Sequence, residues 1–403
     1  MRQWRWIEAG CIAGLVVFAL YFLTGFRFGT LFTVVDRQVD FQIWWVVAGE
    51  IKEFGRYPAS VTGDWANRVL PYAPSGAAML LLLHALPRLV AFGVWIALQG
   101  LAFAAVLWAS LRMSGGGMRR EALLIALIAS LFAASPIGWD FRNHNTNMIY
   151  LALVMLGAVT HRTWLAALLF ALSFNLKLYS VLIPVVLAWR REIALAVATM
   201  VVSALIFVAL PIVVFGVAPF PQLLIDWYGQ VQHTVPPQVQ SQGPATLIRT
   251  VAVLLARDPS APEVTTVLRA VQLGWLVLVA AYFLTAGRAA PTSKEDATRA
   301  RLADLCVALM APLPLSTWLV PYHTVVLLPA FVLLLTVAAK PAFTMWLRGG
   351  ALAAVLACGA LRLIPLGEDY RGGIYLTSFV IIGLALAVVR GFPQSRGAVE
   401  KTL

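Results

Sequence analysis

Two carboxylates stand shortly after the first long apolar segment of the chain. Asp36 and Asp40 follow the run Ile7–Phe26, and Asp40 leads directly into the segment Phe41–Phe54. A carboxylate in this position can act as a general base towards a hydroxyl group. It can equally cap the helix that it precedes, by accepting hydrogen bonds from the first N–H groups. The pattern leaves both roles open for Asp40, and Asp36 could be a cap or a loop anion.

One lysine interrupts an otherwise apolar part of the chain. Lys177 lies between the runs Trp164–Leu176 and Ser180–Trp189. A charge at that depth in a membrane is costly and usually faces a cavity or an anion, and an ammonium group at a helix end suits a phosphate. The alternative is that Lys177 extends to the outer lipid headgroups.

Further basic and neutral polar side chains are candidates for the same chemistry. His323 could be a proton carrier, a donor to phosphate oxygens or a satisfied core histidine, and taken alone it fits the core histidine best. Arg249 lies in a predicted short amphipathic helix, Thr246–Leu255, for which the alternative role is to rest on the membrane. Amide and aromatic groups suit a sugar or a hydroxyl-bearing acceptor, and the candidates are Asn143, His144, Asn145, Asn147, Tyr179, Gln242, Trp318 and Tyr322. The group from 143 to 147 could instead form a helix-terminal turn.

The composition places these side chains in a membrane protein. Of the 403 residues, 61% are hydrophobic and 12% are charged, whereas a soluble domain is about 25% charged. Irregular backbone cannot face lipid, because its unpaired polar groups are costly there, so the sequence predicts an all-α polytopic fold. The net charge of +12 is explained by basic cytoplasmic loops. We expect no nucleic-acid partner, since the chain has no basic, aromatic-bearing soluble module.

The sequence does not indicate a cofactor or a metal. It contains no P-loop and no Gly-rich dinucleotide turn. Cys11, Cys306 and Cys358 lie in apolar runs, without metal or disulfide spacing. Lone carboxylates could still share a divalent ion, and they are Asp36, Asp40 and Asp140.

Twelve apolar runs are candidates to cross the membrane, although several are shorter than the ~20 residues of a full span. They are Ile7–Phe26, Val90–Leu111, Ala122–Ile137, Met148–Val159, Trp164–Leu176, Ser180–Trp189, Ile193–Phe215, Val264–Leu284, Leu302–Leu315, Thr324–Ala339, Gly349–Ile364 and Ile374–Val389. A further stretch, Pro71–Leu86, is expected not to cross, because its crossing would move the basic segment RMSGGGMRRE outside, against the positive-inside rule. We therefore expect about twelve spans, with both termini in the cytoplasm.

This topology gathers the polar segments on the outer face. They are residues 34–42, 140–147, 175–180, 232–249, 316–323 and 368–373. A protein with its polar groups on one side of the membrane is expected to work there, whereas a carrier would place ionisable groups or broken helices near the midplane, often in repeated halves. An enzyme on the outer face has no nucleotide sugars available. Its activated donor would have to arrive as a lipid phosphate.

The first outer loop has a helical pattern. Apolar side chains recur at helical spacing within Phe41–Phe54, and they are Phe41, Trp44, Trp45, Ala48, Ile51 and Phe54. This spacing predicts an amphipathic interfacial helix with its tryptophans at the depth of the lipid headgroups.

Six blocks of the sequence occur in an order that resembles a known family. They are VDFQIWW at 39–45, YPASVTGDWANRVLPYAPSGAAMLLL at 57–82, NHNTNMIYLAL at 143–153, AALLFALSFNLKLYSVLIPVVLAWRR at 166–191, VQSQGPATLIRTVAVLL at 239–255 and PLPLSTWLVPYHTVVLLPA at 312–330. The sequence resembles the GT-C membrane glycosyltransferases, specifically glycosyltransferase family 87, which includes the mycobacterial PimE-type mannosyltransferases. It departs from the family pattern at His144, where Gln is usual, at Ser180, where Pro is usual, and in a loop that lacks the family's Asn before Ser241.

The resemblance implies an inverting sugar transfer, commonly of mannose, from a polyprenyl-phosphate donor to a hydroxyl of a glycolipid or glycan. It implies that Asp40 is the general base that takes the proton from the acceptor hydroxyl. In this scheme Lys177 is the first choice to bind the leaving phosphate, His323 the second, and Arg142 or Arg249 a further cation. Partial burial beside Trp44 would raise the pKa of Asp40 and make it a stronger base.

The resulting hypothesis is one integral membrane domain, residues 1–403, in the plasma membrane. It has extracytoplasmic loops at 27–89 and 217–262, a cytoplasmic tail at 390–403, and its active site on the outer face among membrane lipids. The competing hypotheses are a flippase or transporter of lipid-linked sugars and a noncatalytic partner subunit.

Overall fold

The computed structural model describes residues 40–57, 72–115, 119–233, 247–286, 291, 293–315, 321–363 and 368–391. Within these ranges every regular element is a helix. The elements are α3 (Asp40–Phe54), α4 (Pro74–Leu81), η2 (Leu82–Ala85), α5 (Arg88–Met113), α6 (Arg119–Phe132), α7 (Ala134–Arg142), α8 (Asn147–Val159), α9 (Thr163–Leu176), η3 (Leu178–Ser180), α10 (Ile183–Trp189), α11 (Ile193–Phe215), α12 (Phe220–His233), α14 (Leu247–Leu254), α15 (Pro262–Ala286), α16 (Lys294–Met310), η4 (Leu313–Leu315), η5 (Pro321–Leu327), α17 (Leu328–Ala339), α18 (Met345–Leu363), η6 (Glu368–Tyr370) and α19 (Arg371–Gly391). The expected first span, Ile7–Phe26, lies outside the described residues.

Four of the described helices are long and apolar enough to cross a membrane, and they are α5, α11, α15 and α19. The helices α6 and α7 together would make a fifth, bent by 69°. The predicted apolar run Ala122–Ile137 therefore extends over two helices with a bend between them. Pro136 has no N–H to donate to the carbonyl of Phe132 four residues earlier, which favours a break at this point. The remaining apolar helices are shorter, and the described part of the stretch 71–86, from residue 72 on, contains the short helix α4 and the 3₁₀ turn η2.

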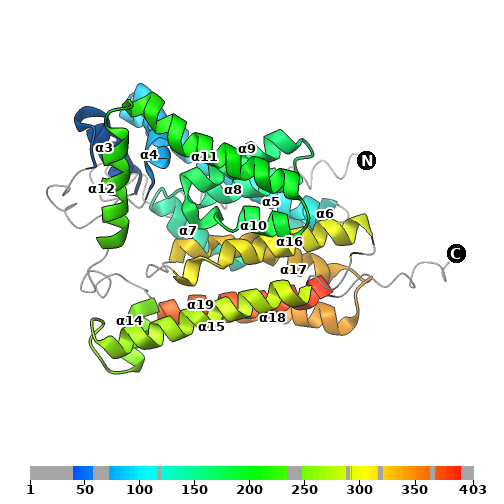
Figure 1. The fold of residues 1–403 in the computed structure, drawn as a ribbon. Helices are drawn as coiled ribbons and strands as arrows, with labels where there is room; N and C mark the ends of the chain where they lie inside the picture. The colour runs from blue at the N-terminus through cyan, green and yellow to red at the C-terminus, as the bar shows by residue number, and fades with distance from the viewer. Residues whose placement is uncertain are drawn as a thin grey trace.

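The helices form layers that run in roughly one direction (Figure 1). On one side α9 packs between α8 and α11, and α5 packs on α8. On the other side α19 packs between α15 and α18. The helices α16 and α17 lie between these groups, and α17 is the central helix because every residue from Leu328 to Val337 is buried. A helix that is buried all round needs no polar face, which explains its uniformly apolar sequence.

Two glycines allow unusually close helix contacts. A Cβ atom at Gly157 of α8 would lie 2.9 Å from the ring of Phe170 on α9, and one at Gly76 of α4 would lie 2.9 Å from the backbone oxygen of Asn175. Small residues let helix backbones approach where a larger side chain would clash. The contact at Gly76 holds α4 against the end of α9, immediately before Lys177.

Helix α3 begins at Asp40, as its sequence pattern predicts, and its buried face packs on protein. Trp44 is 3% exposed; its ring lies 5.2 Å from that of Tyr72 and 4.7 Å from that of Trp95, edge to face in both cases. The helix predicted over Phe41–Phe54 is therefore present, and Trp44 on its apolar face packs against protein rings, while the depth of the tryptophans in the membrane stays a prediction. Helical spacing identifies an apolar face but not what packs on it. Here aromatic rings of α5 and of the segment before α4 pack on the apolar face of α3.

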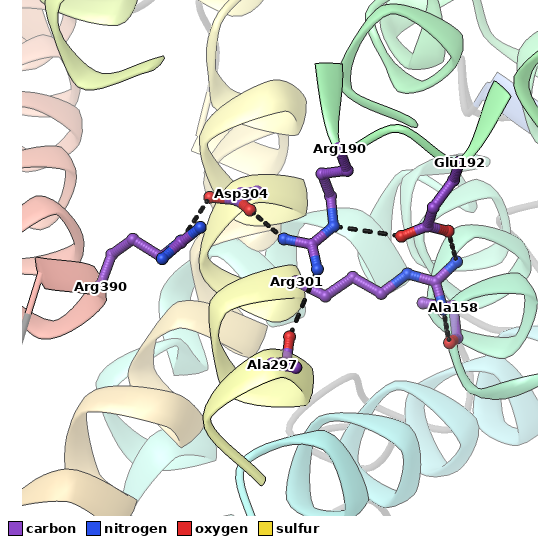
Figure 2. A network of polar contacts seen from close by, with 7 residues as sticks. All are labelled: Ala158, Arg190, Glu192, Ala297, Arg301, Asp304 and Arg390. Atoms are coloured by element: carbon purple, nitrogen blue, oxygen red, sulfur yellow. Dashed lines mark hydrogen bonds and ion pairs between the residues drawn. The ribbon is translucent and has the colours of Figure 1, made fainter. Parts of the chain in front are cut away.

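A buried carboxylate joins helices at the end of the layers that lies away from α3. Asp304 of α16 is fully buried and forms ion pairs with Arg190, which follows α10, and with Arg390 of α19 (Figure 2). The hydroxyl of Tyr282 on α15 also donates to Asp304, at 3.0 Å. Two cations and one hydroxyl surround this single carboxylate. Asp304 therefore joins four helical segments, which are α16, the end of α10, α15 and α19.

A second carboxylate extends the same network. Glu192, at the start of α11, pairs with the guanidinium groups of Arg190 at 3.1 Å and Arg301 at 2.7 Å. Arg301 also donates to the backbone oxygen of Ala158 on α8 at 3.1 Å (Figure 2). We call the set of Arg190, Glu192, Arg301, Asp304 and Arg390 the ionic network.

Candidate active site

Lys177 lies at a break in the chain between α9 and η3. Its backbone is extended, with φ of −155° and ψ of 120°, so the helix stops at Leu176. The half-buried ammonium donates to the side-chain oxygen of Asn145 at 3.2 Å and to that of Asn147 at 2.5 Å. The two amide oxygens hold the ammonium in place, and an ammonium group suits an anionic ligand.

Two phenol rings flank this ammonium. The Nζ atom of Lys177 lies 5.1 Å from the ring centroid of Tyr179 and 6.0 Å from that of Tyr150. The Tyr179 hydroxyl lies 3.5 Å from Nε2 of the buried His323, and the two rings meet edge to face at 5.2 Å. The structure therefore brings together five residues proposed from the sequence: Asn145, Asn147, Lys177, Tyr179 and His323.

Three hydrogen bonds hold the turn that carries Asn145 and Asn147. The buried carboxylate of Asp140 accepts from the N–H of Met148 at 3.2 Å and so caps the start of α8. The N–H of Asn145 donates to the backbone oxygen of Asp140 at 3.0 Å. The amide of Gln99, on α5, donates to the backbone oxygen of Asn145 at 2.9 Å. These bonds fix the backbone between α7 and α8 next to Lys177.

The other residues of that turn make local contacts. Asn143 donates from its amide to the backbone oxygen of Trp139 at 2.9 Å. His144 has a positive φ of 50° and is buried with its ring edge to face with Phe92, at 4.6 Å. Its backbone oxygen accepts from the indole of Trp95 at 3.0 Å. Both residues show the contacts of a helix-terminal turn, the alternative that the sequence left open.

The two candidate arginines lie near other partners. The exposed Arg142 places its guanidinium over the ring of Trp139, 5.2 Å from the centroid. Arg249 of α14 forms an ion pair with Asp369 of η6, and α14 packs on α15 and α19. Sequence reasoning could not pair Arg249 with a partner 120 residues later. The predicted residues Gln242 and Trp318 lie outside the described residues, and Tyr322 belongs to η5.

The packing of α3 connects it to the Lys177 turn. Trp44 contacts Tyr72, and the Tyr72 hydroxyl lies 2.9 Å from that of Thr146. Thr146 donates to the same side-chain oxygen of Asn145 that accepts from Lys177. The helix that begins at Asp40 therefore lies at the same end of the molecule as Lys177.

Sequence reasoning left three residues of this cluster out of the proposed site. Thr146 sits between proposed residues, while Tyr72 is supplied by a distant segment. Tyr150 could have been assigned to the site from the sequence, because it lies three residues after Asn147 and so on the same face of a helix. In the part of the chain that the structure describes, no group of three His, Cys, Asp or Glu residues has an arrangement that could hold a metal ion.

Burial gives His144 a testable pH dependence. It lowers the pKa of His144 to about 4, below the ~6.5 of an exposed histidine. The unfolded chain thus binds a proton that the folded protein does not, and the free energy of unfolding should fall by up to roughly 3 kcal/mol from pH 7 to pH 4. Thermal unfolding in detergent should show a smaller drop for His144→Gln. The exposed His161 provides the control, since His161→Gln should behave as wild type; an equal drop in all three proteins would contradict this account.

Together the fold and the site define a helical membrane protein with an ammonium group, amides and phenols clustered at one end. Such groups can bind an anion and a hydroxyl-rich ligand side by side. The chain belongs to glycosyltransferase family 87, whose family model matches residues 70–314. This range contains Lys177 and both of its asparagine partners, while Asp40 and His323 lie outside it. No curated protein and no solved structure matches the chain.

Proposed function

We propose that this glycosyltransferase moves a sugar, most simply mannose, from a polyprenyl-phosphate donor to a hydroxyl of a glycolipid or glycan. The observation that carries the proposal is the Lys177 ammonium, held at a helix break by two amide oxygens and flanked by two phenol rings. A cation in this setting suits a phosphate monoester or diester, and the surrounding amides and phenols suit sugar hydroxyls. Family membership supports the transferase class.

The proposed chemistry is a single displacement with inversion at the anomeric carbon. Asp40 accepts the proton of the acceptor hydroxyl as its oxygen forms the new bond to that carbon. The bond from the anomeric carbon to the phosphate oxygen breaks, and polyprenyl phosphate leaves with the bonding electrons. Lys177 stabilises the charge on the leaving phosphate, with His323 as a second donor. Further contacts to phosphate, sugar or acceptor are proposed for Arg142, Arg249, Asn143, His144, Asn147, Tyr179, Gln242, Trp318 and Tyr322.

We further propose that the Lys177 end faces the outside of the plasma membrane and that about twelve spans cross it, with both termini cytoplasmic. Three exposed tryptophans mark one end of the layers as a membrane interface: Trp108, near the end of α5, Trp164, near the start of α9, and Trp346, near the start of α18. Tryptophan is enriched at membrane interfaces, and arginine is enriched on the cytoplasmic side. These helix ends lie at the end of the layers that also carries the ionic network (Figure 1).

The proposal is tested by incubating purified protein with a panel of polyprenyl-phosphate sugars and membrane lipid extract. Mass spectrometry should detect a lipid or glycan with one added sugar, together with free polyprenyl phosphate. A flippase would instead move the donor across vesicle membranes without consuming it. The bent pair of α6 and α7 makes this alternative worth testing, because broken helices are frequent in transporters.

Lys177→Gln should raise the dissociation constant of the donor about 10- to 100-fold, since a charged hydrogen bond to the phosphate is lost. Lys177→Arg keeps the charge but not the compact geometry, and its loss should be smaller. The exposed Lys52, on α3, supplies the control, because Lys52→Gln removes one positive charge without touching the cluster. Equal donor affinity in wild type and Lys177→Gln would exclude Lys177 from phosphate binding.

A further inference from the structure

Four side chains from three separate segments form a hydrogen-bonded chain that ends at Lys177. The Tyr72 hydroxyl lies 2.9 Å from the Thr146 hydroxyl, which lies 3.4 Å from the side-chain oxygen of Asn145. That oxygen accepts from Lys177 at 3.2 Å. Tyr72, Asn145 and Thr146 are at most 5% exposed, so water cannot replace a missing member freely.

The donors in this chain have one consistent direction. Thr146 has a single hydroxyl proton, and that proton is directed to the Asn145 oxygen. The Tyr72 hydroxyl must then donate to Thr146, because Thr146 has no second proton to give. Two donors, Thr146 and Lys177, thus converge on one amide oxygen.

This convergence fixes the orientation of the Asn145 amide. If the amide were rotated by half a turn, its NH₂ group would face both the Thr146 proton and the Lys177 ammonium, and donors would meet donors. The Lys177 ammonium, which can only donate, requires the orientation in which the oxygen faces it, and the Thr146 hydroxyl adds a second donor to the same oxygen. Tyr72 fixes the Thr146 hydroxyl in turn, and Tyr72 itself packs against Trp44 of α3.

We propose that Tyr72 and Thr146 are positioning residues that act through the Asn145 amide to hold the Lys177 ammonium in place for a lipid phosphate. The inference rests on the proposed role of Lys177 in donor binding. It also links the helix that begins at Asp40 to the phosphate-binding cation, because the same Tyr72 contacts both α3 and the chain. Neither hydroxyl touches the reacting atoms in this scheme.

A double-mutant cycle on the dissociation constant of polyprenyl phosphate tests the proposal. Tyr72→Phe removes only the hydroxyl, and it should weaken binding about three- to tenfold, the effect of one buried hydrogen bond. In the Lys177→Gln background the same change should have no further effect, because the ammonium that it positions is gone. An equal fold-change in both backgrounds would show that Tyr72 is merely structural and overturn the proposal.

Two further variants separate positioning from folding. Thr146→Val should weaken binding like Tyr72→Phe, whereas Thr146→Ser, which retains the hydroxyl, should restore it. Tyr282→Phe removes a buried hydroxyl at the other end of the molecule and should lower the melting temperature without changing the dissociation constant. If Thr146→Val binds as wild type, the chain has no positioning role.

The same data separate this inference from the proposed function. If Lys177→Gln weakens binding but neither hydroxyl variant does, the positioning role fails and phosphate binding stands. If wild type does not bind polyprenyl phosphate, or Lys177→Gln binds equally well, the role of Lys177 fails and the inference falls with it.

Discussion

Asp40→Asn is expected to lower the turnover number of sugar transfer by about 10²- to 10⁴-fold, the usual contribution of a general base. The amide has the size of the carboxylate but cannot accept the acceptor's proton. The dissociation constant of the polyprenyl-phosphate donor should be unchanged, because the leaving phosphate is assigned to Lys177. Steady-state kinetics at saturating donor and acceptor measure the first effect, and equilibrium binding of the donor measures the second.

Glu53→Gln provides a matched control for that experiment. Glu53 lies on the same helix, α3, and is exposed, so its replacement removes one negative charge from the same segment without affecting a base. Turnover should stay within about twofold of wild type. An unaltered turnover in Asp40→Asn would exclude Asp40 as the general base, and only an absence of turnover in wild type as well would favour the noncatalytic-subunit hypothesis. A parallel loss in both variants would show that the charge of α3, and not a base, is what matters.

Asp304→Ala is expected to lower the free energy of unfolding by about 3–5 kcal/mol. The substitution removes the one carboxylate that Arg190, Arg390 and Tyr282 share. Two guanidinium groups would then lie close together without that shared counter-charge, which is the costly way to break a buried ion pair. Denaturant titration in detergent micelles, followed by loss of the folded species in gel filtration, measures the change.

The control for Asp304 is an exposed carboxylate at a helix start. Glu121, in the first turn of α6, is exposed, and Glu121→Ala should cost at most about 1 kcal/mol through its interaction with the helix dipole. Similar losses in the two variants would mean that the ionic network contributes little beyond an ordinary surface charge. Donor binding in the Asp304→Ala protein that remains folded should be normal, because the network lies at the far end from Lys177.

Hydrophobic periodicity predicted most of the described helices, and the differences from the structure have local physical causes. The run Ala122–Ile137 breaks because of Pro136, which removes one backbone donor. Helix α16 begins at Lys294, eight residues before the predicted run at Leu302. The first turns of α16 are polar, so the apolar run did not include them. Ser293 caps the helix through its side chain, and Arg301 is paired with Glu192.

The candidate site was partly predictable for a different reason. Lys177 was identifiable because a charge inside an apolar run must be compensated, and Asn147, Tyr179 and His323 lay in polar segments assigned to the same face. The partners of these side chains could not be found in the same way. Tyr72 precedes Thr146 by 74 residues, and Arg249 precedes Asp369 by 120. Such pairings depend on the packing of helices, which a single sequence does not determine.

Different kinds of interaction hold the helices together at the two ends of the layers. At the Arg390 end, guanidinium–carboxylate pairs cross between helices of both sides and resist separation together. At the Lys177 end, one ion pair joins Arg249 to Asp369, and the turn between α7 and α8 is joined to Gln99 and Tyr72 by single hydrogen bonds between neutral groups, each worth about 1 kcal/mol. Spreading the helices apart should therefore cost less where Lys177 lies. We expect the helices to separate transiently at the Lys177 end while the ionic network holds them together at the Arg390 end. A long isoprenoid chain could then enter sideways from the bilayer without unfolding of the protein.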